Sequence, residues 1–382
     1  MSSHRQLEAG FSLVEALVAT AIIVSVTAGV LSALNPARGV FKTQPDVADM
    51  QQRLRSGVDA LTRELVSAGA GPYSGAGSGS LAGYFAPIMP FRRGLDSAID
   101  DGVAVFKRDA ISIVYVPSTG AQTTVRSDMT TSSSRVVIDM APGCPKDART
   151  GLVDPLCGFK TNATTAAMFD GTGAVDMLSI TAADEVAHAL DFQHPQQGAL
   201  SKAYVGSASN HLSKIVEISS HVYYLNVATH QLMHYDGFWT VTPVLDGVAL
   251  LDFEYYGDPS PPILVRPGKD QTVTYGPSPP AKDVTQAPFA PGENCTWQMI
   301  GEGQVTRLAS LGSAGGGLVK LTASQLTDGP WCPDDVNANR YDADLLRVRK
   351  VRVTLGVTSG NGSVPDRSVR FDVSPRNLNF GR

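Results

Sequence analysis

The sequence predicts an α+β protein in which a long N-terminal helix packs on an antiparallel β-sheet domain. Residues 11–34 form an almost entirely apolar run, and residues 47–65 place apolar side chains three and four positions apart, as one face of a helix does. The later chain contains short runs rich in β-branched and aromatic residues. Strand and helix patterns do not alternate along it, so we expect the sheet to be antiparallel.

Composition limits the class of protein. The chain has 382 residues, enough for one or two domains, and a net charge of −5. Its 31 basic residues are outnumbered by 36 acidic ones and form no basic stripe, so we expect no nucleic-acid partner. The 37 glycines and 24 prolines agree with a β-rich body that has many loops.

The apolar run is long enough to cross a membrane. Its 24 residues would form a helix of about 36 Å, against about 30 Å for the hydrocarbon core of a bilayer. The run is longer than the apolar region of a secretory signal peptide, and no A-x-A cleavage site ends it. We therefore expect a single membrane helix with the bulk of the protein on one side. An uncleaved plain anchor and a cleaved secretory signal are the alternatives.

Glu15 is the unusual residue of this run. A carboxylate near the end of a membrane helix costs less than one at its centre, but it still requires a partner. The stretch Gly10-Phe11-Ser12-Leu13-Val14-Glu15 resembles the processing site of type IV prepilins and type II secretion pseudopilins. The resemblance implies that a prepilin peptidase cuts between Gly10 and Phe11 and methylates Phe11. It also implies that Glu15 pairs with the new N-terminal amine of a neighbouring subunit during filament assembly.

The resemblance sets an expected location. The chain would sit in the inner membrane as a single-pass protein with a cytoplasmic N-terminus, which Arg5 supports, and a periplasmic body. It would then be incorporated into a pilus or pseudopilus. The expected segments are a leader at 1–10, a transmembrane or filament-core helix at 11–34, an amphipathic helix at 35–68, and a periplasmic pilin-like domain at 69–382 with a Pro-rich insertion at about 259–294.

The amphipathic segment follows residues that disfavour a straight helix. Pro36, Gly39 and Pro45 should kink or interrupt it. Asp49 with Arg53, and Asp59 with Arg63, form acid-first pairs four residues apart, each expected to stabilise the helix by about 0.2–0.5 kcal/mol. The apolar face comprises Val47, Met50, Leu54, Val58, Leu61 and Leu65. We expect this face to pack on the body and the Gly/Ser-rich residues 68–80 to end the helix.

Eight strands are predicted in the body. They cover residues 110–116, 135–140, 175–181, 214–226, 231–235, 248–256, 345–355 and 369–373. Two segments read as low-complexity connections. Residues 118–135 contain ten Ser or Thr, and residues 259–291 contain nine prolines.

Several stretches narrow the resemblance. Four stretches resemble PilW-type minor pilins and the J-type pseudopilin of type II secretion. They are the helix ending at residues 51–71, the hairpin-like residues 223–237, the predicted strand at 248–258, and the terminal Ser374-Pro375-Arg376-Asn377-Leu378. This resemblance implies a non-catalytic structural subunit that helps to initiate or cap a filament. Its partners would be the prepilin peptidase, other minor and major pilin-like subunits, and the inner-membrane assembly machinery. A J-type pseudopilin and a pilus-tip adhesin using the Ser/Thr-rich and Pro-rich segments remain alternatives.

Four cysteines agree with export to an oxidising compartment. Cys144, Cys157, Cys295 and Cys332 allow three pairings. We favour Cys144–Cys157 and Cys295–Cys332, because each pair brackets a Gly/Pro-rich loop. The alternative, a zinc site, lacks the C-x-x-C spacing that such sites use.

No catalytic motif, P-loop or dinucleotide fingerprint occurs, so we expect a protein that is not an enzyme and uses no cofactor. Two groups contain metal-ligand residue types, but we predict no metal site. The first group is histidine-rich and consists of Glu185, His188, Asp191, His194, His221, His230 and His234. The second consists of Asp334, Asp335, Asn337, Asn339, Asp342 and Asp344, which lack the EF-hand spacing; calcium stays open as an alternative to a solvated turn.

Overall fold

The computed structural model describes most of the chain, with gaps. The described residues are 12–70, 86–94, 98–99, 101, 105–117, 121–140, 144–146, 149–160, 164–169, 175–193, 199–200, 202–207, 213–260, 279–286, 289–294, 297–308, 310–313, 316–327, 342–359 and 364–378; for 33–42 only the backbone is described. These residues form an N-terminal apolar helix and antiparallel β-sheets, which confirms the α+β class.

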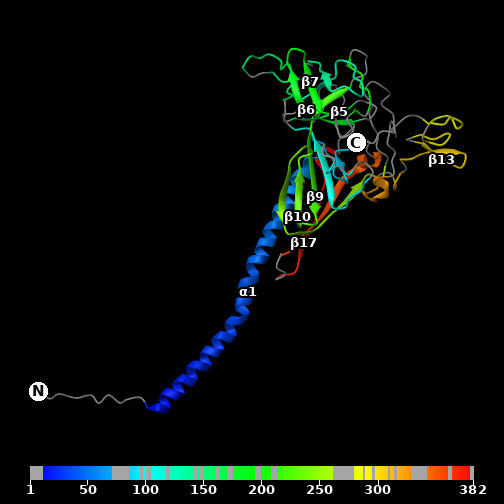
Figure 1. Cartoon of the computed structure of the whole chain (residues 1–382). Helices are drawn as coiled ribbons and strands as arrows, with labels where there is room; N and C mark the ends of the chain where they lie inside the picture. Colours follow the sequence, from blue (N-terminus) through cyan, green and yellow to red (C-terminus); the bar gives the residue numbers. More distant parts are fainter. Residues whose placement is uncertain are drawn as a thin grey trace, which may run out of the picture.

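The helix α1 runs from Leu13 to Ser67, 55 residues without a break. Pro36, Gly39 and Pro45 therefore do not interrupt it. A proline inside a helix removes one backbone hydrogen bond and its ring crowds the preceding turn, and a helix can absorb this by bending. Figure 1 shows α1 following a curved path from its free N-terminal half into the β-rich body.

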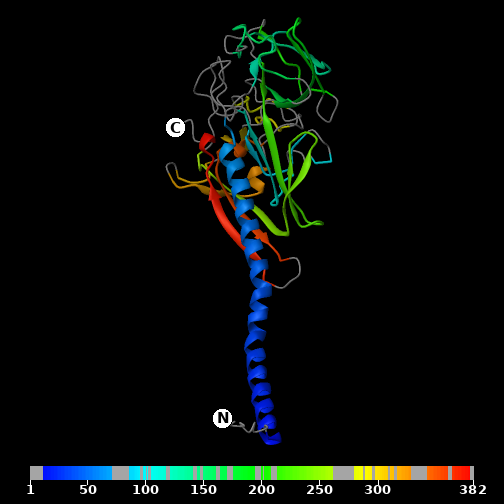
Figure 2. The ribbon, with the colours of Figure 1, turned by 90° about the vertical axis from the view of Figure 1, so that its left-hand side faces the viewer.

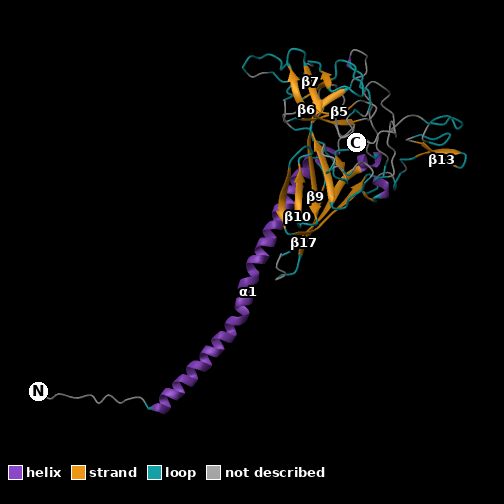
Figure 3. Cartoon of the chain, viewed as in Figure 1, coloured by secondary structure: helices purple, strands orange, loops and turns teal. Residues whose placement is uncertain are grey.

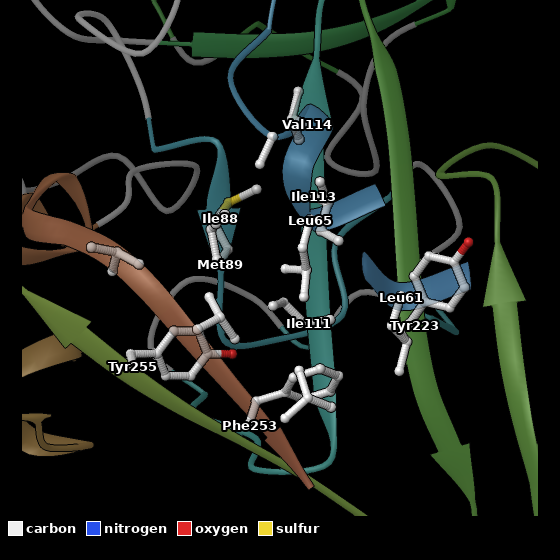
Figure 4. Close-up of a cluster of buried hydrophobic side chains, with 14 of the residues drawn as sticks. Leu61, Leu65, Ile88, Met89, Ile111, Ile113, Val114, Tyr223, Phe253 and Tyr255 are labelled. Atoms are coloured by element: carbon white, nitrogen blue, oxygen red, sulfur yellow. The ribbon is translucent and has the colours of Figure 1, made fainter. Parts of the chain in front are cut away.

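Two antiparallel sheets pack against one face of the C-terminal half of α1. The five-stranded sheet has the order β1 (Ile88–Met89), β2 (Ala110–Tyr115), β9 (Ser219–Asn226), β10 (Gln231–Tyr235) and β11 (Val241–Asp246). The four-stranded sheet has the order β15 (Val319–Leu321), β12 (Val248–Gly257), β16 (Val348–Val357) and β17 (Arg367–Val373). Side chains of both sheets and of α1 belong to one hydrophobic core, here called the body core (Figure 4).

A third sheet forms a separate small barrel. Its order is β3 (Gln122–Thr124), β8 (Lys214–Glu217), β5 (Thr165–Phe169), β6 (Val175–Asp184), β7 (Ala189–Gln193) and β4 (Arg135–Val137). A bridge between Val125 and Ile138 joins the ends of β3 and β4, so the six strands close on themselves. The barrel has its own core, which includes Met168, Leu178 and Tyr204.

The barrel is an insertion between two neighbouring strands of the five-stranded sheet. Tyr115 at the end of β2 pairs with Ser219 at the start of β9, and the barrel strands lie between these residues in sequence. Only Ile218 separates β8 of the barrel from β9 of the body. Phe169 and Val216, on the outer side of the barrel, are buried in the body core, so the two units are packed together. Figures 1 and 2 place the barrel at the end of the body opposite the N-terminal half of α1.

A two-stranded hairpin projects from the body, β13 (Trp297–Ile300) paired with β14 (Gly303–Thr306) (Figure 3). A hairpin alone is marginally stable. The amide of Gln304 donates to the carbonyl oxygens of Pro280 and Gly292, and Arg307 pairs with Glu293 at 2.8 Å. Three short 3-10 helices, η3 (Ser324–Leu326), η4 (Ala343–Arg347) and η5 (Arg376–Leu378), lie in the C-terminal third.

Each of the eight predicted strands has a counterpart, with three informative differences. Residues 214–226 form two strands that belong to different sheets. The strand expected at 345–355 starts at Val348, because residues 343–347 form η4. The expectation that residues 118–135 are a connection is wrong in part, because this segment contains the strand β3. Thr123 of β3 is buried, and threonine is a residue that favours strands. Of the Pro-rich segment, residues 261–278 and 287–288 lie outside the described residues, and the rest contains no helix or strand.

The barrel contains a disulfide bond between Cys144 and Cys157, as the local pairing predicts. The bond closes a loop with a sequence separation of 13 residues, and both cysteines are buried in the barrel core. Cys295 and Cys332 lie outside the described residues, so their pairing stays a prediction.

We expect the double substitution Cys144→Ala and Cys157→Ala to destabilise the barrel by about 3 kcal/mol, the chain-entropy value for a loop of this size. Hydrogen exchange followed by mass spectrometry should show faster exchange in β4, β6 and β7. Strands β12 and β16 of the body serve as internal control. Equal acceleration in the body strands would contradict a barrel that opens as a separate unit.

Candidate functional site: the N-terminal helix and its contact with the sheets

The N-terminal part of α1 is apolar and uncovered. Residues Leu13–Ser32 have a mean hydropathy of 2.2, and none of them is buried by the rest of the described chain. A helix of this length and composition can serve as a membrane span or as a signal sequence. The predicted cleavage site, Gly10 and Phe11, lies outside the described residues.

Glu15 has a local partner that the sequence analysis did not foresee. Its Oε2 accepts a hydrogen bond from the Ser12 backbone N–H at 3.2 Å, and the Ser12 hydroxyl accepts from the Glu15 N–H at 3.2 Å. These two bonds form a capping box, which satisfies N–H groups that the first turn of any helix leaves unpaired. The S-x-x-E spacing of Ser12 and Glu15 is the sequence signal for this motif. Glu15 therefore helps to cap the N-terminus of α1, whatever other contacts it makes.

The C-terminal half of α1 contacts both body sheets. Met50, Leu61 and Leu65 are fully buried in the body core, and Val47, Leu54 and Val66 are partly buried against it. The two predicted ion pairs, Arg53 with Asp49 at 2.6 Å and Arg63 with Asp59 at 2.7 Å, are confirmed.

Gly57 sets how closely α1 approaches the sheets. A Cβ atom at this position would lie 2.6 Å from Leu355 Cδ2 and 3.1 Å from Leu245 Cδ2, so a side chain would displace core leucines from two sheets. Glycine in a helix interior costs about 1 kcal/mol relative to alanine. At position 57 the absence of a side chain allows close packing of the helix on the sheets. This role cannot be recognised from the sequence, because it depends on leucines far away along the chain.

The C-terminal end of α1 is held by residues from the far end of the chain. The side-chain amide of Asn377 in η5 donates to the carbonyl oxygens of Val66 and Ala68, each at 3.4 Å. The N–H of Gly69, at a φ of 68°, donates to the Val114 carbonyl at 3.0 Å. Carbonyl groups that the last turn leaves unpaired thus find partners.

A polar cluster lies beside these last turns. His221 Nδ1 and His234 Nε2 are 2.7 Å apart, and His221 Nε2 is 3.1 Å from the Tyr115 hydroxyl. Burial lowers the pKa of His221 and of His234. It also raises the pKa of Glu64 in α1, whose charge interacts with that of His234. Both histidines belong to the histidine-rich group of metal-ligand residue types in the sequence. Their contact across β9 and β10 depends on the register of the hairpin.

The remaining predicted ligand residues are dispersed. His188 Nδ1 lies 3.0 Å from the Pro155 carbonyl oxygen in the barrel, and His230 is exposed in the turn after β9. Asp342 caps η4, and Asp344 pairs with the fully buried Arg347 at 2.5 Å. His194, Asp334, Asp335, Asn337 and Asn339 lie outside the described residues. Within the described ranges, no three His, Cys, Asp or Glu side chains are grouped so that they could hold a metal ion.

Comparison with known proteins identifies no relative. No family model matches the chain, and no curated protein or solved structure is significantly similar to it. Functional inference therefore depends on the helix, its termini and its contact with the sheets.

We expect Gly57→Leu to lower the free energy of unfolding by about 1–3 kcal/mol, the usual cost of overpacking a core, although leucine favours helix. Thermal unfolding of the full chain in detergent, followed by near-UV circular dichroism, measures this. The matched control is Ser56→Leu, one position earlier and exposed. Equal unfolding temperatures for the two variants would show that position 57 has room for a side chain.

Proposed function

We propose that the chain is a minor subunit of a type IV pilus, a non-catalytic protein that helps to initiate or cap the filament. The observation that carries this proposal is the division of one unbroken helix into a bare apolar half and a half buried in a β-rich body. A bare apolar helix requires either lipid or other apolar helices around it. A membrane supplies the first before assembly, and a bundle of subunit helices supplies the second afterwards.

The amphipathic character assigned to residues 35–68 supports the same proposal. Its apolar face supplies Met50, Leu61 and Leu65 to the body core, while Arg55, Asp59 and Arg63 are exposed. The helix can therefore carry the body at a fixed orientation relative to its free half. In this proposal the body is periplasmic, the N-terminus is cytoplasmic, and the partners are the prepilin peptidase, other pilin-like subunits and the assembly machinery.

A partner-binding role at the tip is a second candidate, because the barrel lies at the end farthest from the free half of α1 (Figure 1). Its exposed apolar side chains include Leu152 and Val186, which are 70% and 92% exposed. This candidate no longer depends on residues 118–135 as a loop. Deleting them would remove β3 and open the barrel, so a binding defect in that deletion would not identify a binding loop.

Processing is the first test. We expect the mature chain, produced together with a prepilin peptidase, to begin at N-methylated Phe11, and N-terminal mass spectrometry of membrane-extracted protein measures this. Gly10→Ile should retain the Met1 terminus, because a β-branched side chain replaces the residue that the processing motif requires. A wild-type chain that keeps Met1, or that is cut near Leu34, would refute the prepilin assignment.

Assembly is the second test. Glu15→Gln should keep the capping box, because glutamine also serves there, and it removes the charge. We expect normal cleavage and membrane insertion but loss of this protein from sheared filaments, since the neighbouring amine would be left as an unpaired charge in a low-dielectric bundle.

Ser12→Ala is the matched control for Glu15→Gln. It removes the capping hydroxyl, at a cost of about 1 kcal/mol, and keeps the carboxylate. Incorporation should therefore fall with Glu15→Gln and persist with Ser12→Ala. The opposite result would make helix capping, and not charge pairing, the role of Glu15 in assembly.

A further inference from the structure

The pair His221–His234 lies on the side of the five-stranded sheet that faces α1. His221 shares this side of β9 with Tyr223, and His234 lies opposite Tyr223 on β10. The two imidazole rings stack with their centroids 5.0 Å apart, and Tyr115 stacks on His221 at 5.5 Å. Tyr223, which packs on His234 at 5.0 Å, belongs to the body core together with Leu61 and Leu65 of α1 (Figure 4).

The 2.7 Å contact requires one proton between two nitrogen atoms. His221 Nδ1 and His234 Nε2 can form a hydrogen bond only when one of them carries hydrogen and the other accepts. If both rings become imidazolium ions, two N–H groups and two positive charges face each other. The contact must then open, and the rings must separate or reach water.

Few charges are placed to neutralise such a pair. The charged groups near the cluster are Glu64 and Arg63 on α1 and Asp236 in the turn after β10. Tyr115 on β2 and Tyr223 on β9 contribute hydroxyl groups. Arg63 is paired with Asp59, and one carboxylate oxygen of Asp236 accepts from the N–H groups of Phe238, Trp239 and Thr240. Glu64 Oε2 is buried and has no hydrogen-bond partner in the described chain.

We propose that the His221–His234 pair is a pH-sensitive latch that holds the last turns of α1 on the five-stranded sheet and releases them on acidification. The proposal is independent of any role in a filament. It needs only the contact between the two imidazoles and the position of Glu64 on α1, close enough for its charge to interact with that of His234.

The direction of the pH effect follows from the two kinds of group. Burial lowers the pKa of both histidines, so the stability they contribute is complete above the unfolded value of about 6.5 and is lost as the pH falls below it. Burial raises the pKa of Glu64, so its contribution has the opposite sign and is lost as the pH rises. Removing the histidines should therefore abolish the acid-induced loosening. Glu64→Gln should enhance it, because it removes a group whose protonation stabilises the folded state as the pH falls.

Hydrogen exchange of the full chain in detergent at about pH 7.5 and 5.5 tests the latch, with rates corrected for intrinsic exchange. A histidine that titrates at about 6.5 when the helix is released, and stays neutral when it is docked, changes the opening equilibrium by about tenfold between these two pH values. We expect exchange in residues 60–67 to rise about tenfold at the lower pH in the wild type, and less than twofold in the double variant His221→Gln and His234→Gln. Glutamine retains a donor and an acceptor but does not titrate.

The control is His230→Asn, which removes an exposed histidine at a φ of 52°, a conformation that asparagine tolerates. It should respond to pH as the wild type does. An equal acid-induced increase in the double variant, or none in the wild type, would overturn the proposal. If the double variant does not fold, imidazole NMR of the wild type decides, because two histidines that titrate independently at or above about 6.5 would also overturn it.

Discussion

The close contact between α1 and the two body sheets is the constraint on which the architecture depends. Because Gly57 has no side chain, the helix backbone can approach Leu245 and Leu355, which come from different sheets. Helix residues on either side of this point are then buried among strand side chains in one core. Burial of a large apolar side chain contributes about 1.5–3 kcal/mol, so a few such residues are enough to fix the helix on the body. Within the part of the chain that the structure describes, the bare half of α1 is connected to the body through the continuity of the helix and this contact.

The barrel depends on the same core. The barrel is inserted in the chain between β2 and β9. Without it, the pairing of Tyr115 with Ser219 would make these two strands a simple hairpin. Its outer residues Phe169 and Val216 are buried in the body core, so the insertion is not a pendant domain on a flexible linker. The chain passes from β8 to β9 through a single residue, so the barrel adjoins the sheet that carries the histidine pair.

Polar side chains cap both ends of the helix, where the backbone leaves N–H and carbonyl groups unpaired. Ser12 and Glu15 satisfy N–H groups of the first turn, and Asn377 satisfies carbonyl groups near the last. The histidine pair and Glu64 are different, because they are polar groups placed beside an apolar core. Burial of such groups costs stability unless they are paired, which is why their protonation is coupled to the position of the helix.

The sequence by itself determined the features that depend on local pattern. The apolar run predicted the free half of α1, and the alternation of residues such as those in 248–256 predicted strands. The spacing of three and four predicted most of the helix residues that reach the core, but it included Val58 and missed Val66. The Cys144–Cys157 bond was favoured among three possible pairings because the two residues bracket a Gly/Pro-rich loop, and the structure contains it. The capping role of Glu15 is also encoded locally, in the S-x-x-E spacing of Ser12 and Glu15.

Only the tertiary structure decided the features that depend on residues far apart in sequence. Gly57 looks like a weak helix residue until Leu245 and Leu355 meet it, and Asn377 caps a helix that ends some 310 positions earlier. His221 and His234 face each other because the hairpin register and the packing of α1 bring them to one side of a sheet. The barrel closes through a bridge between Val125 and Ile138, and such pairing is fixed by packing on both faces of a strand rather than by the local propensity of either segment.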